Sequence, residues 1–335
     1  MLSVGRISYI NCYPVYGAID RGILPLDGQL VSGVPTELNR KMAEGNLDVS
    51  VVSAVEYARD ADRYLLLPDL AISCDGPVRS VMLFSNVPAE DLTGKTVIVS
   101  KSSMTSVALL ELLFEHVWHA KPNFVLGDAE MSDIARLDEQ CDARLVIGDA
   151  ALVLVAGRAG VEAVEGYGSA TPSTASTPTL PATLCVTPND AGLDGSEGCE
   201  RALRSRSPLA PLTPIKTGAP GYSYAYDLGE TWKQWTGLPF VFAVWVAQRT
   251  TKVAAALKVH AQLIESRNWG VTHLDILAAQ AHGTTNVPLD ACREYLSGLD
   301  YGLSYQHLAG LTEFFRRLVQ RGRVPNGTLA FLSAA

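Results

Sequence analysis

Residues 95–118, with the sequence KTVIVSKSSMTSVALLELLFEHVW, contain the pattern that decides the fold. Residues 95–100 form a short, apolar and β-branched run, which predicts a buried strand. A polar turn rich in hydroxyl groups follows, and residues 107–118 then predict an apolar helix. A buried strand that runs into a helix is the repeating unit of an α/β protein.

The same alternation recurs along the chain and predicts an α/β architecture with mainly parallel sheets. Apolar or β-branched runs predict the strands, while proline, capping residues and helical spacing predict the helices. Further strands are expected at residues 4–10, 48–52, 78–84, 145–148 and 240–246, and further helices at residues 34–44, 54–58, 251–267, 274–281, 289–296 and 305–321.

The composition is that of a globular protein and argues against several classes of partner. Hydrophobic residues make up 47% of the 335 residues and charged residues 19%, which is typical of a chain with a sizeable core. The formal net charge is −8, and Lys and Arg form no run, so nucleic acid and membrane surfaces are poor partners. A small anionic ligand stays compatible with this charge, because a few local donors are enough to hold it.

The chain also has the features expected of a cytoplasmic protein. It contains no window of about 18 apolar residues that would predict a membrane span. Its first residues, MLSVGRISYINCYP, begin on a strand pattern rather than on a secretory signal. The six cysteines form no CxxC pair, which favours reduced thiols over disulfides or a zinc site.

Residues 166–221 interrupt the α/β pattern. They are rich in Ser, Thr, Pro, Gly and Ala and show little periodicity. Such a composition buries too little apolar surface to offset the entropy of ordering, so we expect a disordered insertion here.

The hydroxyl groups between the strand 95–100 and its helix form the strongest candidate site. The first backbone N–H groups of a helix have no partner inside the helix, and the helix dipole adds a partial positive charge. A carboxylate or a phosphate fits such a position. The alternative is a simple helix cap, which needs only one hydroxyl. The candidates are Ser102, Ser103, Thr105 and Ser106.

Further polar residues stand at strand ends, where α/β proteins collect their ligands. Asn11 offers a donor and an acceptor, but from the residues alone an Asx-turn, in which Asn11 bonds to its own loop, is the favoured explanation. Ser53 and Asp149 follow strands and are also in position to cap helices. Arg79 and Ser80 open a strand, and Arg79 has the alternative of a solvated surface charge.

No established catalytic motif accompanies these residues. The sequence lacks HExxH, GxSxG, Walker and GxGxxG patterns. His116 and His119 lie three residues apart, but no further ligand completes a metal site, so a helix surface is favoured. A Ser–His–Asp arrangement stays open, without any feature that points to it.

Several segments, in order, resemble the chorismate dehydratases of the futalosine route to menaquinone. The likeness covers most of the chain outside residues 166–221. It is carried by ISYINCYP (7–14), GVPTELNRKMAEGNLDVSVVSAVEYA (33–58), GPVRSVMLFS (76–85), SKSSMTSVALLELL (100–113), VIGDAAL (146–152) and YDLGETWKQWTGLPFVFAVW (226–245).

The resemblance implies a fold, a reaction and a set of site residues. The fold would be that of type II periplasmic binding proteins, with a cleft between two α/β lobes. The apolar strands at residues 78–84 and 240–246 have the pattern of the two crossings, so we expect one lobe from residues 1–85 and 243–335 and the other from residues 86–242. Chorismate would lose water to give 3-[(1-carboxyvinyl)oxy]benzoate, with no metal or organic cofactor. Asn11 and Ser80 would lie closest to the reacting ring, and Ser53 with residues 102–106 would bind carboxylates. Arg79 and Asp149 are further candidates for substrate binding.

Three other functions use the same kind of fold. A solute-binding protein would capture a small organic anion without chemistry, but it would carry a secretory signal. The sister enzyme that cleaves cyclic dehypoxanthine futalosine is expected to use a histidine base, and no histidine stands at these strand ends. A regulatory domain would be joined to a DNA-binding segment, which the sequence does not contain. No motif bears on the oligomeric state.

Overall fold

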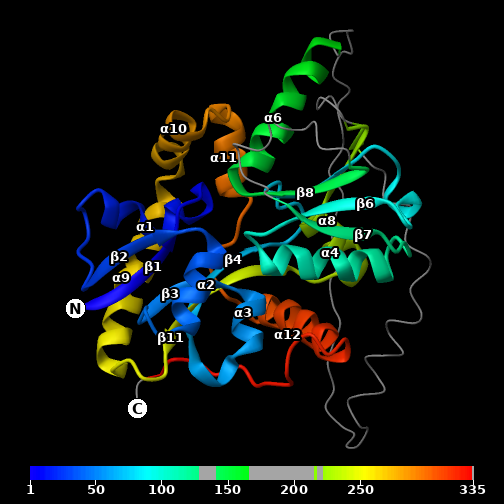
Figure 1. Cartoon of the computed structure of the whole chain (residues 1–335). Coiled ribbons are helices and arrows are strands. Elements are labelled where there is room, and N and C mark those ends of the chain that lie inside the picture. The colour runs from blue at the N-terminus through cyan, green and yellow to red at the C-terminus, as the bar shows by residue number, and fades with distance from the viewer. Residues whose placement is uncertain (128–140, 166–214, 217–221, 334–335) are drawn as a thin grey trace, which may run out of the picture.

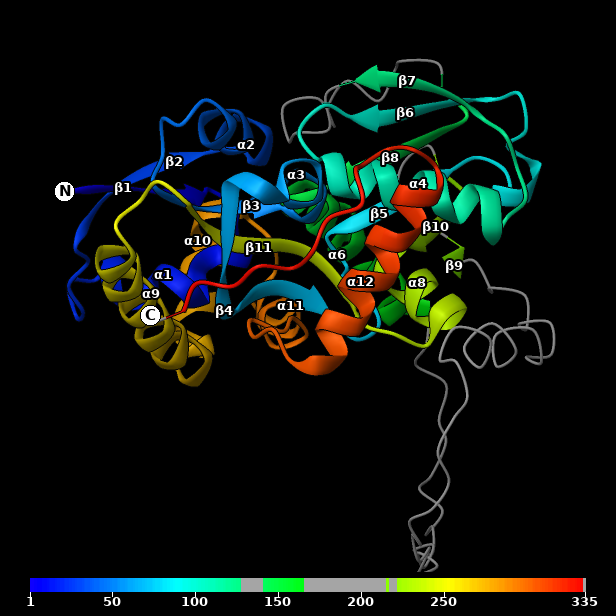
Figure 2. The same cartoon turned by 90° about the horizontal axis from the view of Figure 1, so that it is seen from below.

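Two mixed sheets with helices packed on them form the described part of the chain (Figures 1 and 2). The computed structural model describes residues 1–127, 141–165, 215–216 and 222–333. The insertion expected at residues 166–221 therefore lies outside the described residues, apart from the short strand β9, Ile215–Lys216. Within the described ranges, no helix combines the length and the apolar character that a membrane span requires.

The first sheet has the strand order β2-β1-β3-β11-β4. β1 pairs in parallel with β2 and β3, whereas β11 runs antiparallel to both β3 and β4. Because β11 comes from far along the chain, this sheet is completed only by the C-terminal part. Its strands are Leu2–Ile7 (β1), Gly28–Gly33 (β2), Val49–Ser53 (β3), Tyr64–Cys74 (β4) and Phe240–Gln248 (β11).

The second sheet has the strand order β7-β6-β8-β5-β10-β9. β6 is parallel to β7 and β8, and β5 is antiparallel to β8 and β10. This sheet contains the strand 95–100 from which the fold was predicted. Its other strands are Val81–Ser85 (β5), Thr96–Ser100 (β6), Asn123–Gly127 (β7), Ala143–Ile147 (β8) and Tyr224–Asp227 (β10).

Helices pack on both sheets and on each other. α3 and α12 pack against β11, α1 packs against α9, and α4 packs against β6 and α8. The α-helices are Tyr13–Asp20 (α1), Pro35–Ala43 (α2), Ala54–Arg59 (α3), Met104–His116 (α4), Gly148–Glu165 (α6), Leu228–Thr236 (α8), Val253–Thr272 (α9), Leu274–Thr285 (α10), Leu289–Ser297 (α11) and Tyr305–Gln320 (α12), and the short 3-10 helices are Ile10–Cys12 (η1), Ala61–Arg63 (η2) and Ala89–Asp91 (η3).

The sheets are more antiparallel than the sequence predicted. β5 and β11 lie inside their sheets and run antiparallel to the strands on both sides. All of β5 and nearly all of β11 is buried. A strand buried on both faces has the same continuous apolar composition whether it is parallel or antiparallel, so the pattern did not reveal the direction.

The chain crosses between the two sheets twice, and the crossings differ from the predicted lobe boundaries. β4 ends at Cys74 and β5 begins at Val81, while β10 ends at Asp227 and β11 begins at Phe240. β5 therefore belongs to the second sheet and all of β11 to the first, so the boundaries near residues 85 and 243 are corrected to 75–80 and 228–239. An apolar strand pattern shows burial but not which sheet accepts the strand.

A single carboxylate ties the two crossings together. The partly buried side chain of Asp227 caps α8 by accepting hydrogen bonds from the backbone N–H groups of Gly229 and Glu230, at 2.9 and 3.1 Å. It also accepts from the N–H groups of Val78 and Arg79, at 3.0 and 2.6 Å, in the other crossing. These bonds fix the backbone on which Ser80 stands.

Candidate active site

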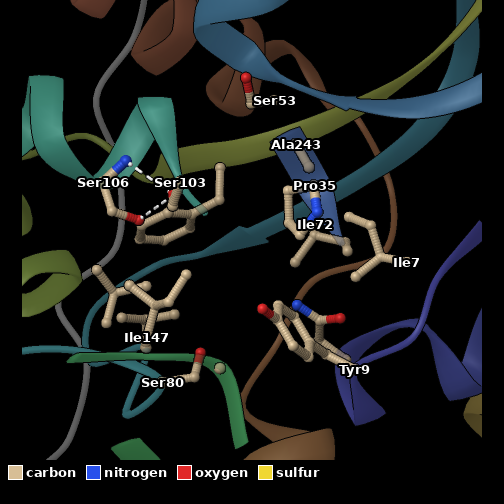
Figure 3. A pocket seen from close by; sticks show the side chains of 15 residues that line it. Ile7, Tyr9, Pro35, Ser53, Ile72, Ser80, Ser103, Ser106, Ile147 and Ala243 are labelled. Atoms are coloured by element: carbon tan, nitrogen blue, oxygen red, sulfur yellow. Dashed lines mark hydrogen bonds between the residues drawn. The ribbon is translucent and has the colours of Figure 1, made fainter. Parts of the chain in front are cut away.

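A cavity of about 60 Å³ lies where the two sheets approach each other. This volume exceeds the roughly 10–15 Å³ that one water molecule needs. Ile7 and Ala243 line it from the first sheet, and Val81 and Ile147 line it from the second (Figure 3). Its polar lining consists of Tyr9, Asn11, Ser53, Ser80, Ser103 and Ser106.

Ser103 and Ser106 stand at the start of α4, as the sequence predicted. The Ser103 hydroxyl caps the helix by accepting a hydrogen bond from the Ser106 N–H, at 3.3 Å. It donates its own proton to Oγ of Ser106, at 2.7 Å. One lone pair of Ser106 is therefore occupied inside the protein, and its hydroxyl proton is available to the cavity (Figure 3).

The other two hydroxyl groups of this turn do not line the cavity. The Thr105 side chain accepts a hydrogen bond from the backbone N–H of Val55, at 3.2 Å, and so links α4 to the start of α3. The Ser102 backbone N–H donates to Oγ of Ser100, at 2.9 Å. The simple capping explanation thus holds for Ser103, while Ser106 keeps a free donor.

Ser53 lines the cavity but is strongly engaged in the protein. Its Oγ accepts hydrogen bonds from Nδ2 of Asn39, at 3.0 Å, and from the N–H of Glu56, at 3.2 Å. The Ser53 N–H in turn donates to Oδ1 of Asn39, at 3.1 Å. The predicted helix cap is therefore present, and Asn39 is a supporting residue that the sequence did not reveal.

Asn11 supplies the cavity with an unmatched acceptor. Its Oδ1 is buried and has no hydrogen-bond partner among the described residues. Buried polar atoms are nearly always paired, and each exception calls for an explanation. An Asx-turn would pair Oδ1 with a backbone N–H, and no such bond is present in the described residues. A ligand that donates a hydrogen bond to Oδ1 would explain the unpaired oxygen.

Arg79 and Asp149 lie outside the cavity lining. The Arg79 guanidinium pairs with Glu294, at 2.6 Å. The Asp149 carboxylate accepts a hydrogen bond from the N–H of Ile10, at 3.3 Å, next to Asn11. Burial raises the pKa of Asp149 to about 6, which outweighs the lowering effect of that hydrogen bond. Asp149 therefore holds the loop that carries Asn11, whereas Arg79 forms an ion pair with an exposed carboxylate.

Tyr9 and Gly148 were missed by the sequence analysis. Tyr9 follows the first strand and lines the cavity next to Asn11. Gly148, at the end of β8, has a φ of +63°, and a Cβ added there would lie 3.3 Å from the Tyr9 ring. The glycine thus permits both the left-handed backbone and the close approach of the ring. Tyr9 falls inside the strand predicted at residues 4–10, so the sequence did not show that it follows the strand.

Comparisons with known proteins identify the family. The model of a family described as menaquinone biosynthesis matches residues 2–204 and 213–320. The chain belongs to the menaquinone-biosynthesis family. This match includes most of residues 166–221, which the resemblance had left out. A chorismate dehydratase from Thermus thermophilus is 29% identical to this family member over 317 residues, which cover 94% of each chain.

Solved structures confirm the predicted periplasmic-binding-protein fold for this member of the menaquinone-biosynthesis family. A protein from Archaeoglobus fulgidus matches with a TM-score of 0.65 and 17% identity, over 96% of this chain and 98% of the other. The alkanesulfonate-binding protein from Xanthomonas axonopodis pv. citri matches with a TM-score of 0.56 and 12% identity, over 98% and 96%. A Candida albicans protein, described as having the generic periplasmic-binding-protein fold, matches with a TM-score of 0.53 and 10% identity, over 100% and 98%.

Proposed function

We propose that this protein is a chorismate dehydratase of the futalosine route to menaquinone. It would convert chorismate into 3-[(1-carboxyvinyl)oxy]benzoate and water, and so act as a hydro-lyase. The menaquinone-biosynthesis family and the Thermus thermophilus relative named chorismate dehydratase support this reaction. Asn11, Ser80 and Ser106 come from three of the segments that resemble the chorismate dehydratases, and all three residues line the same cavity.

The observation that carries the proposal is the hydrogen-bonding character of the cavity. Ser80 and Ser106 each accept a hydrogen bond from a protein hydroxyl, so their own protons are free to bind an acceptor. Asn11 presents the opposite group, a buried oxygen that receives no hydrogen bond from the part of the chain that the structure describes. Chorismate carries two carboxylates, which accept hydrogen bonds, and one ring hydroxyl, which donates. The two serine hydroxyls therefore complement the carboxylates of chorismate, and the Asn11 oxygen complements its ring hydroxyl.

The proposed chemistry needs a proton acceptor that the cavity lining lacks. Dehydration removes the proton at ring C3 and the hydroxyl at C4, and the new C3–C4 double bond makes the ring aromatic. Among the described residues that line the cavity there is no carboxylate, histidine or lysine. We therefore assign the base to the enolpyruvyl carboxylate of the substrate itself, which would accept a hydrogen bond from Nδ2 of Asn11, while Oδ1 of Asn11 would accept from the ring hydroxyl. Positioning of this kind lowers a barrier substantially.

Ser80 completes the proposed mechanism by assisting the leaving group. As the C4–O bond breaks, negative charge develops on the departing oxygen. A prearranged hydroxyl donor aimed at that oxygen stabilises the transition state more than the ground state. The proton taken from C3 combines with the departing hydroxide, so the protein neither gains nor loses a proton overall.

The main alternative is a binding protein for a small organic anion, since the alkanesulfonate-binding protein shares the fold. The sister reaction is less favoured, because all six histidines are described and none of them lines the cavity. The test is to incubate the purified protein with a large molar excess of chorismate, and in parallel with cyclic dehypoxanthine futalosine, and to identify the products by mass spectrometry. Many molecules of 3-[(1-carboxyvinyl)oxy]benzoate per protein support the proposal; unchanged chorismate favours the binding protein.

A further inference from the structure

Tyr295 does not line the cavity, but its hydroxyl contacts a residue that does. It lies on α11, and its side chain is buried, with 1% of its surface exposed. The phenol O–H donates a hydrogen bond to Oγ of Ser80, at 2.9 Å. Ser80 is itself 4% exposed, so this bond is shielded from water. None of the segments that predicted the site contains Tyr295.

The rest of Ser80 is fixed as firmly as its side-chain oxygen. Its backbone N–H donates to the carbonyl of Val78, at 2.7 Å, and its carbonyl accepts from the N–H of Gly148, at 2.7 Å. These bonds hold Ser80 between the first crossing and the start of α6. With the backbone and Oγ both anchored, the hydroxyl proton is the one group of Ser80 whose direction is still to be set.

The Tyr295 phenol is the donor of the Tyr295–Ser80 hydrogen bond, with its oxygen 2.9 Å from Oγ of Ser80. Burial raises the pKa of Tyr295, and the nearby Asp149 carboxylate adds to this effect. Tyr295 therefore keeps the proton that it donates. A serine hydroxyl has one proton and two lone pairs. Because Tyr295 occupies one lone pair, the Ser80 proton cannot point at Tyr295 and is left for an acceptor in the cavity.

We infer that Tyr295 is a positioning residue that directs the Ser80 proton toward the ligand. This inference rests on the proposed function and extends it to a residue outside the cavity. In the dehydration, the directed proton forms a hydrogen bond to the departing C4 hydroxyl and stays on Ser80. Without Tyr295, the Ser80 hydroxyl rotates freely and meets the departing oxygen in only part of its orientations.

The test is a double-mutant cycle in chorismate turnover with Tyr295→Phe, Ser80→Ala and the combined variant. Tyr295→Phe removes only the hydroxyl, and we expect kcat to fall about five- to tenfold with little change in KM. Ser80→Ala should lower kcat further. Because Tyr295 acts through Ser80, adding Tyr295→Phe to Ser80→Ala should cause no further loss.

Tyr301 provides a matched control. It is also a buried tyrosine, and its hydroxyl donates to the carbonyl of Leu296, at 3.2 Å, instead of to a cavity residue. Tyr301→Phe should lower the melting temperature about as much as Tyr295→Phe does, yet leave kcat unchanged. Wild-type kcat in Tyr295→Phe, or losses that multiply in the combined variant, would overturn the inference alone. An unmodified protein that leaves chorismate intact would overturn the proposed function, and this inference with it.

Discussion

At the scale of single residues, the hydrogen bonds within the protein determine which donors and acceptors of the cavity are left for a ligand. Ser106 and Ser80 have lone pairs occupied by other hydroxyls, whereas Asn11 has an oxygen with no donor. The same residue types would form no site if their partners were arranged differently. This is shown by Thr105, whose hydroxyl oxygen is bound to the Val55 N–H and does not line the cavity.

The role of Asn11 gives the first prediction. If the substrate carboxylate is the base, Asn11→Asp does not restore catalysis by adding a base. Its charge would face a dianion, and like charges at ~4 Å repel by about 1 kcal/mol in water and several-fold more in a closed cleft. We expect Asn11→Ala to turn over chorismate slowly and Asn11→Asp to bind it more weakly still. Steady-state kinetics checks this, and faster turnover by Asn11→Asp than by Asn11→Ala would point to a protein base.

Asp149 gives a prediction about pH and stability. Its folded-state pKa of about 6 lies above the ordinary aspartate value of 3.8, because burial disfavours the charged form. The folded protein therefore binds more protons than the unfolded chain between these values, so stability is lost as pH rises through this window. Asp149→Asn removes the charge and keeps an oxygen for the Ile10 N–H. We expect the variant to be more stable than wild type by about 2 kcal/mol near neutral pH.

The control for Asp149 is the same pair of proteins at acid pH. Both side chains are neutral in the folded and the unfolded protein only well below pH 3.8, so the two unfolding free energies should converge there. The titratable groups in electrostatic contact with Asp149 are Cys12, Cys292 and Tyr295, and burial raises the pKa of each. They stay neutral across the window and do not mask the effect. A stability difference that is independent of pH would contradict the assignment to Asp149.

At the scale of elements, the start of α4 combines a structural and a functional role in two neighbouring serines. Ser103 accepts the Ser106 N–H and so caps the helix, while Ser106 offers its proton to the cavity. The sequence predicted four hydroxyl candidates here without separating them. Their roles depend on which face of the first helical turn meets the other sheet, and that is decided by long-range packing.

Mutation of the two serines should affect different properties most strongly. Ser103→Ala removes the cap and should lower stability by about 1 kcal/mol. Ser106→Ala leaves the cap in place and removes a donor to a charged group, which costs about 1.5–3 kcal/mol of binding. Thermal unfolding and isothermal titration with chorismate measure the two effects. Equal affinity in Ser106→Ala and wild type would leave Ser106 with a structural role only.

The elements themselves were predictable where their pattern was local. The strand–turn–helix unit at residues 95–118 and the helices after residue 250 appear in the structure near the predicted positions. β4 was not predicted, because it contains Pro68 and Asp69 in its middle, and Asp69 has a φ of +54°. β2 was missed because its composition, GQLVSG, has little apolar character.

At the scale of the whole molecule, residues far apart in the sequence meet because the chain crosses twice between the sheets. Asp227 links the two crossings, and Asp149 links the start of α6 to the N-terminal loop that carries Asn11. The rule that ligands collect at strand ends pointed to Asn11 and Ser53, and the family resemblance added Ser80; all three line the cavity. The sequence did not predict Asn39 or Tyr295, because these residues contact the site only through tertiary packing and have no local sequence signal.

The central claim is that chorismate loses water in the cavity between the two sheets. The most direct measurement is the rate of 3-[(1-carboxyvinyl)oxy]benzoate formation, followed by proton NMR, for the wild-type protein and for an Asn11→Ala/Ser80→Ala variant with an unchanged fold. The two substitutions remove one group from the N-terminal loop and one from the first crossing. The account predicts steady product formation by wild type and a loss of at least about a hundredfold in the variant. Equal rates, or no product from wild type, would contradict it.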